Sequence, residues 1–123
     1  MKHDIKLEKA ENLALGIIRL CRLLTKEKTE YVISQQLLRS GTSIGANISE
    51  AYYSESRADF IHKLCISQKE ANETLYWLRL LQKSGVITES NYSPLYAQTE
   101  EILKILSSAI RSLKSDLRKS SNT

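Results

Sequence analysis

Apolar residues recur at steps of three and four along almost the whole chain, in four stretches that short polar breaks separate. This spacing places the apolar side chains of each stretch on one face of an α-helix. The 123 residues include one proline and four glycines, and no stretch alternates apolar and polar residues for long enough to form a sheet. A β-sandwich or barrel would need that alternation and many turn residues. The pattern therefore predicts an all-α fold.

The polar breaks set the bounds of four predicted helices. We expect the first helix over about residues 4–25, the second from Thr29 to about Tyr53, the third over 57–83, and the fourth from 88 or 93 to about 118. Short connections favour antiparallel neighbours, so the prediction is an up-down-up-down four-helix bundle. It forms a single domain over residues 1–123, with fraying at residues 119–123.

Side chains at the predicted helix ends support these bounds. Thr29 and Ser56 are expected N-caps, and Gly85 stands where a helix C-terminus commonly has glycine. Pro94 leaves two readings of the fourth helix open. It can lie in the first turn if Ser93 caps that helix, or it can lie inside and kink a helix that begins near Thr88.

Two features of the middle helices predict close packing. Gly41 and Gly45 lie four apart in the second helix, on the face of its apolar residues. Each interior glycine costs about 1 kcal/mol relative to alanine, so the pair indicates either close approach by another helix or a bend. The third helix is apolar over a wide arc, with one face formed by Phe60, Leu64, Ala71, Leu75 and Leu78 and a second side by Ile66, Trp77 and Leu81. It is therefore either central in the bundle or in contact with another subunit.

The residues that could carry chemistry do not form a predicted catalytic or metal site. A di-iron bundle needs two Glu-x-x-His pairs that face inward, but only Asp59 and His62 have a comparable offset, and His3 is the other histidine. We interpret His62 as a surface or interface residue. Cys21 and Cys65 lack a CxxC spacing and are expected to be buried free thiols. No GxSxG elbow or phosphate-binding loop occurs, so we expect no enzymatic activity, no metal and no cofactor.

Two observations bear on the location of the protein. No stretch approaches the roughly 18 consecutive apolar residues of a membrane span. The N-terminus leads into an amphipathic pattern rather than the apolar core of a signal peptide. We therefore expect a cytoplasmic protein without a membrane partner.

The middle of the chain resembles a known family. The run RSGTSIGANISE covers residues 39–50, and the run ADFIHKLCISQKEANETLYWLRLL covers residues 58–81. Both are similar to the four-helix-bundle family named after proteins encoded in intervening sequences of bacterial 23S rRNA genes. The matching positions are Arg39, Ser43, Ile44, Asn47, Ile48, Glu50, Phe60, Lys69, Glu70, Ala71, Glu73, Thr74, Trp77 and Leu78. At Ala51 the chain departs from the family, since many relatives have glycine there.

This resemblance implies a bundle that assembles into a ring-like homopentamer. It also implies a relation to the accessory variability protein of diversity-generating retroelements, which resembles this family and works with RNA and a reverse transcriptase. The family name records the location of a gene rather than any chemistry. A partner such as RNA or a reverse transcriptase is thus an expectation that comes from the resemblance alone.

Several of the matching positions carry polar or aromatic side chains, and we expect them to hold helices or subunits together. They are Arg39, Asn47, Glu50, Glu70, Glu73 and Trp77. A planar guanidinium and a carboxylate can fix the register of an interface. The alternative is that these residues form a ligand site. Trp77, on the second apolar side of its helix, is the first choice for a subunit contact.

The net charge of +4 is concentrated near the C-terminus, because residues 102–123 carry five basic residues against Asp116 alone. At about 100° per residue around the helix axis, one quarter of the circumference of the fourth helix holds Lys104, Arg111, Lys114 and Arg118. The face of the first helix opposite its core residues holds Arg19, Arg22 and Lys26. If these helices are antiparallel, positive charge also gathers at one end of the bundle, where Lys2, Lys6 and Lys9 would lie near Lys114, Arg118 and Lys119.

Such a basic surface attracts phosphate backbones without reading sequence. A solvated face, with cations favoured at a helix C-terminus, is the alternative. The resemblance favours the first interpretation. We predict a non-enzymatic homo-oligomer whose basic surface binds RNA, another nucleic acid or a nucleic-acid-associated protein. The second hypothesis is an oligomeric protein-interaction scaffold whose charge serves solubility.

Overall fold

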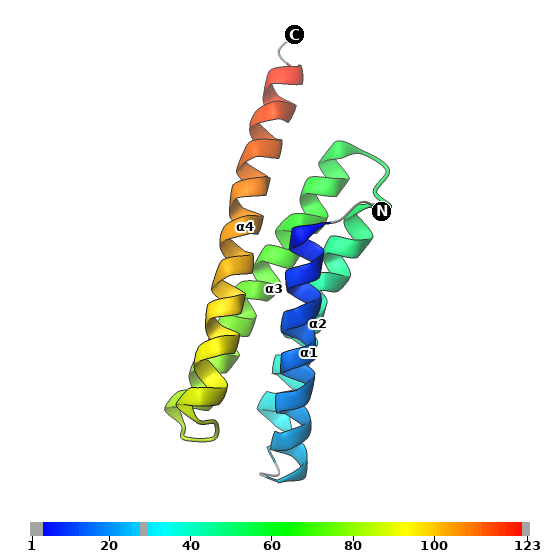
Figure 1. Cartoon of the computed structure of the whole chain (residues 1–123). Coiled ribbons are helices and arrows are strands. Elements are labelled where there is room, and N and C mark those ends of the chain that lie inside the picture. The colour runs from blue at the N-terminus through cyan, green and yellow to red at the C-terminus, as the bar shows by residue number, and fades with distance from the viewer. Residues whose placement is uncertain (1–3, 28–29, 122–123) are drawn as a thin grey trace.

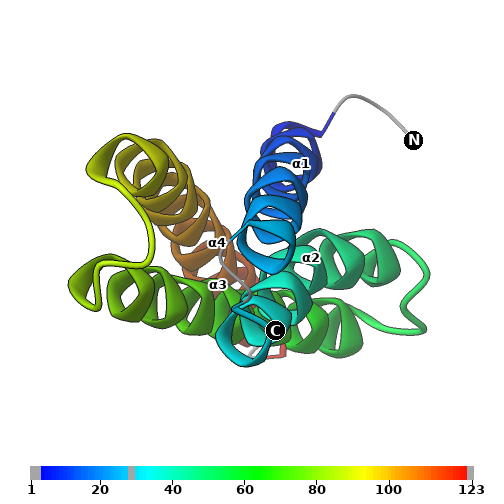
Figure 2. The ribbon, with the colours of Figure 1, turned by 90° about the horizontal axis from the view of Figure 1, so that it is seen from below.

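Four helices make up the computed structural model, which describes residues 4–27 and 30–121. They are α1 (Ile5–Lys26), α2 (Val32–Ala51), α3 (Arg57–Lys83) and α4 (Glu89–Ser121). Successive helices run in opposite directions, each packs against the next, and α4 returns to α1 (Figure 1, Figure 2). No strand occurs in these two ranges. The predicted all-α, up-down-up-down bundle is confirmed.

The ends of α3 follow the chemistry of their capping residues. The Ser56 hydroxyl accepts a hydrogen bond from the backbone N–H of Asp59 at 3.0 Å. Gly85, just after the helix, has a φ angle of 79°, a left-handed value that favours glycine. Both capping predictions for this helix are confirmed.

The start of α2 differs from the prediction. Thr29, the expected N-cap, lies outside the described residues, and the helix begins at Val32. The Glu30 carboxylate accepts a hydrogen bond from the backbone N–H of Ile33 at 3.0 Å. An acidic side chain thus satisfies one of the N–H groups that a first helical turn leaves without a partner. The helix ends at Ala51, two residues before the predicted end.

Thr88 caps the fourth helix, so that Pro94 lies inside it. The Thr88 Oγ1 atom accepts a hydrogen bond from the Asn91 backbone N–H at 3.2 Å. Of the two readings that Pro94 left open, the one with proline inside the helix is correct. The helix also continues to Ser121, so residues 119–121 are helical where fraying was expected.

The core contains apolar side chains from all four helices. The largest fully buried ones are Leu13, Ile17 and Leu24 of α1, Leu37, Ile44 and Ile48 of α2, Leu64, Leu78 and Leu81 of α3, and Ile102 and Leu106 of α4. The predicted core position Phe60 is only half-buried, and its neighbour Ile61 is buried instead. Phe60 packs edge-on against Tyr52 at a ring distance of 5.7 Å. Within the described ranges, no helix combines the length and the apolar character needed to cross a membrane.

Helix α3 is apolar over a wide arc because two neighbours cover it. It packs against both α2 and α4, and each of these contacts is more extensive than that between α1 and α4. On its second side, Leu81 is buried, and Ile66 and Trp77 are half-buried. Of the two explanations for the wide arc, a central place in the bundle therefore accounts for most of it.

Both cysteines are free thiols, as predicted, but they differ in burial. Cys21 is buried, and its Sγ atom donates to the Ser34 carbonyl oxygen at 3.3 Å. Burial raises the pKa of the Cys21 thiol to about 11. Cys65 is half-buried, so the expectation of burial is wrong for this residue. Because the thiolate is the nucleophile, the raised pKa makes Cys21 unreactive at neutral pH.

Glycine lets α1 and α2 approach closely. A Cβ atom on Gly41 would lie 2.4 Å from Ile17 Cδ1, whereas one on Gly45 would lie 3.4 Å from Ala10 Cβ. The first distance is a clash and the second is an ordinary contact. Close packing therefore explains Gly41, whose missing side chain makes room for Ile17.

The Gly41→Ala substitution is expected to lower the free energy of unfolding by about 1 kcal/mol, because crowding Ile17 outweighs the helix propensity of alanine. Gly45→Ala is the matched control and is expected to raise that free energy by up to about 1 kcal/mol. Urea unfolding followed by circular dichroism measures both changes. If Gly41→Ala proves as stable as Gly45→Ala, the contact with Ile17 does not constrain the helix pair.

Candidate nucleic-acid interface

Small polar side chains join α2 to α3 inside the bundle. The buried hydroxyls of Ser40 and Thr74 share a hydrogen bond of 2.9 Å. The buried Ser67 hydroxyl donates to the Ile44 carbonyl oxygen at 2.8 Å. Because these side chains are small and paired, the helices can pack closely without leaving polar atoms unsatisfied. The contacts fix the orientation of α3 and so determine which of its faces stays exposed.

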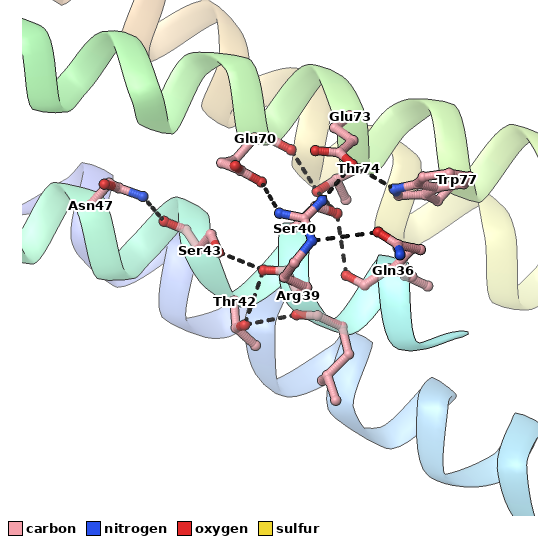
Figure 3. Close-up of polar contacts among 12 residues, drawn as sticks. Gln36, Arg39, Ser40, Thr42, Ser43, Asn47, Glu70, Glu73, Thr74 and Trp77 are labelled. Carbon is pink, nitrogen blue, oxygen red and sulfur yellow. Dashed lines mark hydrogen bonds and ion pairs between the residues drawn. The ribbon is translucent and has the colours of Figure 1, made fainter. Parts of the chain in front are cut away.

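Arg39 of α2 contacts two carboxylates of α3 (Figure 3). Its Nη1 atom lies 3.1 Å from Glu70 Oε2, and its Nη2 atom binds Glu73 Oε1. The same Glu73 oxygen accepts a hydrogen bond from Trp77 Nε1 at 3.2 Å. We refer to these four residues as the Arg39 cluster. The predicted structural contact therefore exists, and it joins two helices of one chain.

Trp77 is half-buried and packs against the core of its own chain. Its ring lies 5.1 Å from the ring of Tyr76, centroid to centroid, at an angle of 64°. Its indole N–H is used by Glu73. The subunit contact that the sequence suggested for Trp77 stays a prediction.

The Arg39 cluster changes the proton affinity of its members. The hydrogen bond from Arg39 lowers the pKa of Glu73, against the opposing effect of partial burial, and the Trp77 N–H lowers it further. The same hydrogen bond raises the pKa of Arg39. Both groups are charged at neutral pH, and opposite charges at this distance cancel much of each other's field.

Two other polar positions of α2 lie apart from the Arg39 cluster. Asn47 Nδ2 donates to the Ser43 carbonyl oxygen at 2.8 Å, within its own helix (Figure 3). Glu50 is exposed, and its Oε2 atom lies 3.5 Å from Lys63 Nζ. The sequence grouped both residues with Arg39, but the structure separates them from it.

A cleft of about 680 Å³ opens between α3 and α4, and we call it the α3–α4 cleft. Its lining combines cations, amides and an aromatic ring and consists of Gln68, Lys69, Asn72, Glu73, Tyr76, Arg79, Leu103 and Ser107. Gln68 Nε2 donates to Ser107 Oγ at 2.9 Å, which links the two helices. Arg79 Nη1 donates to the Tyr96 hydroxyl at 3.2 Å, which orients the guanidinium.

The basic residues predicted on α4 are all exposed, and we call them the α4 stripe: Lys104, Arg111, Lys114 and Arg118. Ser107 of the cleft lies on the same face, about 60° from Lys104 and about 20° from Lys114 around the helix. The stripe therefore borders the α3–α4 cleft. Within the described ranges, Lys104, Arg111 and Lys114 have no ion-pair partner.

The basic residues of α1 lie at the other end of the bundle. Arg19 lines a pocket of about 290 Å³ with Pro94, where α1 meets the start of α4. Arg22 and Lys26 follow toward the end of α1, and all three are exposed. Roughly 15 Å of helix separates Pro94 from Lys104, the near end of the α4 stripe, and roughly 30 Å separates Pro94 from Lys114. On one chain, the two predicted groups of basic residues do not form one surface.

The predicted approach of Lys6 and Lys9 to the C-terminal end of α4 is wrong. Lys9 Nζ lies 2.8 Å from Glu101 Oε1, and Lys6 pairs with Asp4, while Lys2 lies outside the described residues. Lys114 is about 20 Å further along α4 than Glu101. Because α4 has 33 residues and α1 has 22, the C-terminal end of α4 extends beyond the other helices (Figure 1).

No group of three or more His, Cys, Asp or Glu side chains that could hold a metal ion occurs in the part of the chain that the structure describes. His62 is exposed, in agreement with its interpretation as a surface residue. Exposed polar and charged groups line the α3–α4 cleft, and they are the candidates for ligand contact.

Sequence reasoning did not identify the α3 side of this cleft. Lys69, Asn72 and Tyr76 are exposed at spacings of three and four, so they follow one face of the helix. That spacing is the signal that could have found them. They share no residue type, however, and a search for like charges or apolar stripes passes over such a mixed row.

Comparisons with known proteins agree with this architecture. The family described as 23S rRNA-intervening sequence protein matches residues 3–108. The chain is also similar to a crystal structure of a protein with unknown function from the S23 ribosomal protein family of Bacteroides thetaiotaomicron VPI-5482. The two structures have a TM-score of 0.85, and the sequences are 49% identical. The match covers 86% of this chain and 98% of that one. None of the curated proteins matches. The family match includes the α3–α4 cleft and ends before Arg111.

Removing the positive charge of the Arg39 cluster is expected to destabilise the bundle by about 1 kcal/mol at pH 7, because Glu70 and Glu73 then repel each other without a counter-ion. Glu73 has a lowered pKa in the folded state, so its contribution is present above the ordinary value of 4.5 and is lost as the pH falls through the folded value. Urea unfolding of the Arg39→Gln variant and of wild type at several pH values measures this difference in the free energy of unfolding.

Lys63→Gln is the matched control, since it removes an exposed ion pair with Glu50 and is expected to change stability by less than about 0.5 kcal/mol. The difference between wild type and Arg39→Gln should shrink as the pH is lowered. A loss no larger than that of Lys63→Gln at pH 7 would show that the Arg39 cluster does not stabilise the helix pair.

Proposed function

The chain belongs to the family of 23S rRNA-intervening sequence proteins, and we propose that it is a non-enzymatic homo-oligomer that binds RNA through the α4 stripe. The observation that carries this proposal is a row of exposed cations beside a polar cleft. Three of these cations, Lys104, Arg111 and Lys114, have no ion-pair partner among the residues that the structure describes. Their charge is available to phosphate groups.

The length of the α4 stripe suits a nucleic-acid backbone. Lys104 and Lys114 are about 15 Å apart along the helix axis, so the stripe can contact several successive phosphates. Each phosphate that a lysine or arginine neutralises releases counterions, which makes binding favourable at low salt and weak at high salt. Backbone contact of this kind gives affinity without sequence recognition.

Assembly would strengthen such binding. A homopentamer, which the family resemblance implies, would carry about +20 from five chains at +4 each. An RNA that occupies one stripe would then meet the next at a high effective concentration. Exposed apolar side chains at the start of α2 support a contact between copies, because Tyr31 and Val32 are adjacent and are 57% and 72% exposed.

Charge reversal on α4 is expected to abolish RNA binding. The triple variant Lys104→Glu, Arg111→Glu and Lys114→Glu should weaken binding to a structured RNA by at least about 100-fold at low salt, because attraction becomes repulsion. Fluorescence anisotropy at several salt concentrations measures the affinity. The wild-type affinity should fall steeply as salt rises, and the slope should be smaller in the triple variant.

The α1 triple variant Arg19→Glu, Arg22→Glu and Lys26→Glu is the matched control, since it makes the same change in net charge at the other end of the bundle. It is expected to retain most of the affinity. An equal loss in both variants would contradict a site on α4. A wild-type protein that binds no RNA at low salt would contradict the proposed function and favour a protein-interaction scaffold.

Light scattering coupled to size-exclusion chromatography is expected to give a mass near 70 kDa, five times the chain mass of 14.0 kDa. The mass should not change in the α4 triple variant, because the proposal assigns the substituted side chains to RNA rather than to the contact between copies. A mass of one chain at micromolar concentration would contradict the proposed oligomer.

A further inference from the structure

We propose that the α3–α4 cleft binds an unpaired nucleobase and that Tyr76 is the side chain on which the base stacks. This inference rests on the proposed function, because it assigns a specific ligand to the surface beside the α4 stripe. The ligand class is single-stranded RNA or DNA, whose bases are free to leave the strand.

Tyr76 has the properties of a stacking platform. Its side chain is 47% exposed, although it lies in the lining of the cleft. Its ring packs edge-on against Trp77, at 5.1 Å between centroids, and Trp77 is held in turn by Glu73. The exposed part of the side chain is therefore open to a ligand, while the neighbouring indole limits the movement of the ring. Aromatic side chains on which bases stack are the common feature of sites for single strands.

Amide groups stand beside the ring. Asn72 lies one helical turn before Tyr76 and is exposed, and Gln68 lies a turn earlier. An amide presents both a donor and an acceptor, so it can pair with the hydrogen-bonding edge of a base. Gln68 already donates to Ser107, which leaves Asn72 as the amide with its groups directed to solvent.

Cations lie at both ends of the α3 side of the cleft. Lys69 and Arg79 are ten residues apart, and both line it. The Tyr96 hydroxyl accepts a hydrogen bond from Arg79 at 3.2 Å, so this guanidinium is oriented before a ligand arrives. On the α4 side, the stripe begins at Lys104, beside Leu103 of the lining. A phosphate backbone can therefore run along the α3 side or the α4 side of the cleft, while a base enters between the two helices.

The acidic side chain of the cleft does not oppose this binding. Glu73 is the carboxylate of the lining, and its charge is compensated by Arg39 of α2. Outside the cleft, Glu100 is exposed on the α4 face that carries the stripe, about one turn before Lys104. It bounds the positive surface at that end.

A single strand fits these features better than a duplex does. The cleft volume of about 680 Å³ is that of a site for a small molecule, so it can hold a base with its sugar. A duplex keeps its bases stacked on one another and presents phosphates outward. It could use the α4 stripe but not the ring of Tyr76.

The test compares three fluorescently labelled probes at constant low salt: a single strand of about 12 nucleotides, an abasic strand of equal length and an RNA duplex. Tyr76→Ala is expected to weaken binding of the single strand about tenfold and to leave the abasic strand and the duplex unchanged. Tyr76→Phe should retain the wild-type affinity. Tyr53→Ala is the matched control, because Tyr53 is 83% exposed outside the cleft lining.

Emission from Trp77, the one tryptophan in the sequence, gives a second readout beside the stacking ring. The single strand should quench it, whereas the abasic strand should not. If Tyr76→Ala and Tyr53→Ala bind the single strand equally well, or if the abasic strand binds as tightly as the single strand, the base site is wrong and the phosphate contact of the α4 stripe stands. If wild type binds none of the three probes, the proposed function itself is wrong.

Discussion

The contact of Arg39 with Glu70 and Glu73 is the interaction on which the exposed surface of this bundle depends. Two carboxylates on successive turns of α3 would make that helix acidic, and Glu73 lies in the lining of the α3–α4 cleft. The single guanidinium of Arg39, from α2, compensates the charge of both carboxylates. The contact therefore joins two helices and also leaves Lys69, Arg79 and the α4 stripe as the dominant charges around the cleft.

Close packing of α2 makes this contact possible. Gly41 admits Ile17 of α1 on one side, and the Ser40–Thr74 hydrogen bond joins α3 on the other. Small side chains at both interfaces allow the backbones to approach, so the long Arg39 side chain reaches across to the carboxylates of α3 while part of it stays exposed. The same packing leaves one face of α3 uncovered, and that face contributes Asn72 and Tyr76 to the cleft.

Local features of the fold could be predicted from the sequence, whereas features that depend on the relative placement of helices could not. Helix bounds at Ser56 and Gly85 follow from capping within a few residues. The choice between Phe60 and Ile61 as the buried residue does not follow from local sequence. Both residues are apolar, and the side chains packed against them decide which one is buried. The Lys9–Glu101 pair likewise depends on the register of α1 against α4.

The candidate site shows the same division. The α4 stripe could be predicted because like charges at helical spacing are visible in one segment, and its exposure is confirmed. The Arg39 cluster could be predicted only as a set of characteristic positions, since the sequence does not say which of them meet. The α3–α4 cleft combines unlike residues from segments that pair only in the folded chain, and no local pattern indicates it.

Photocrosslinking tests most directly whether nucleic acid binds at the α3–α4 cleft and the α4 stripe. A single strand that contains 5-iodouridine is irradiated with the wild-type protein, and mass spectrometry locates the crosslinked residue. We expect a crosslink at Tyr76 that is lost when excess unlabelled single strand competes. Crosslinks confined to the Arg19–Lys26 segment of α1, with none on α3, would contradict it.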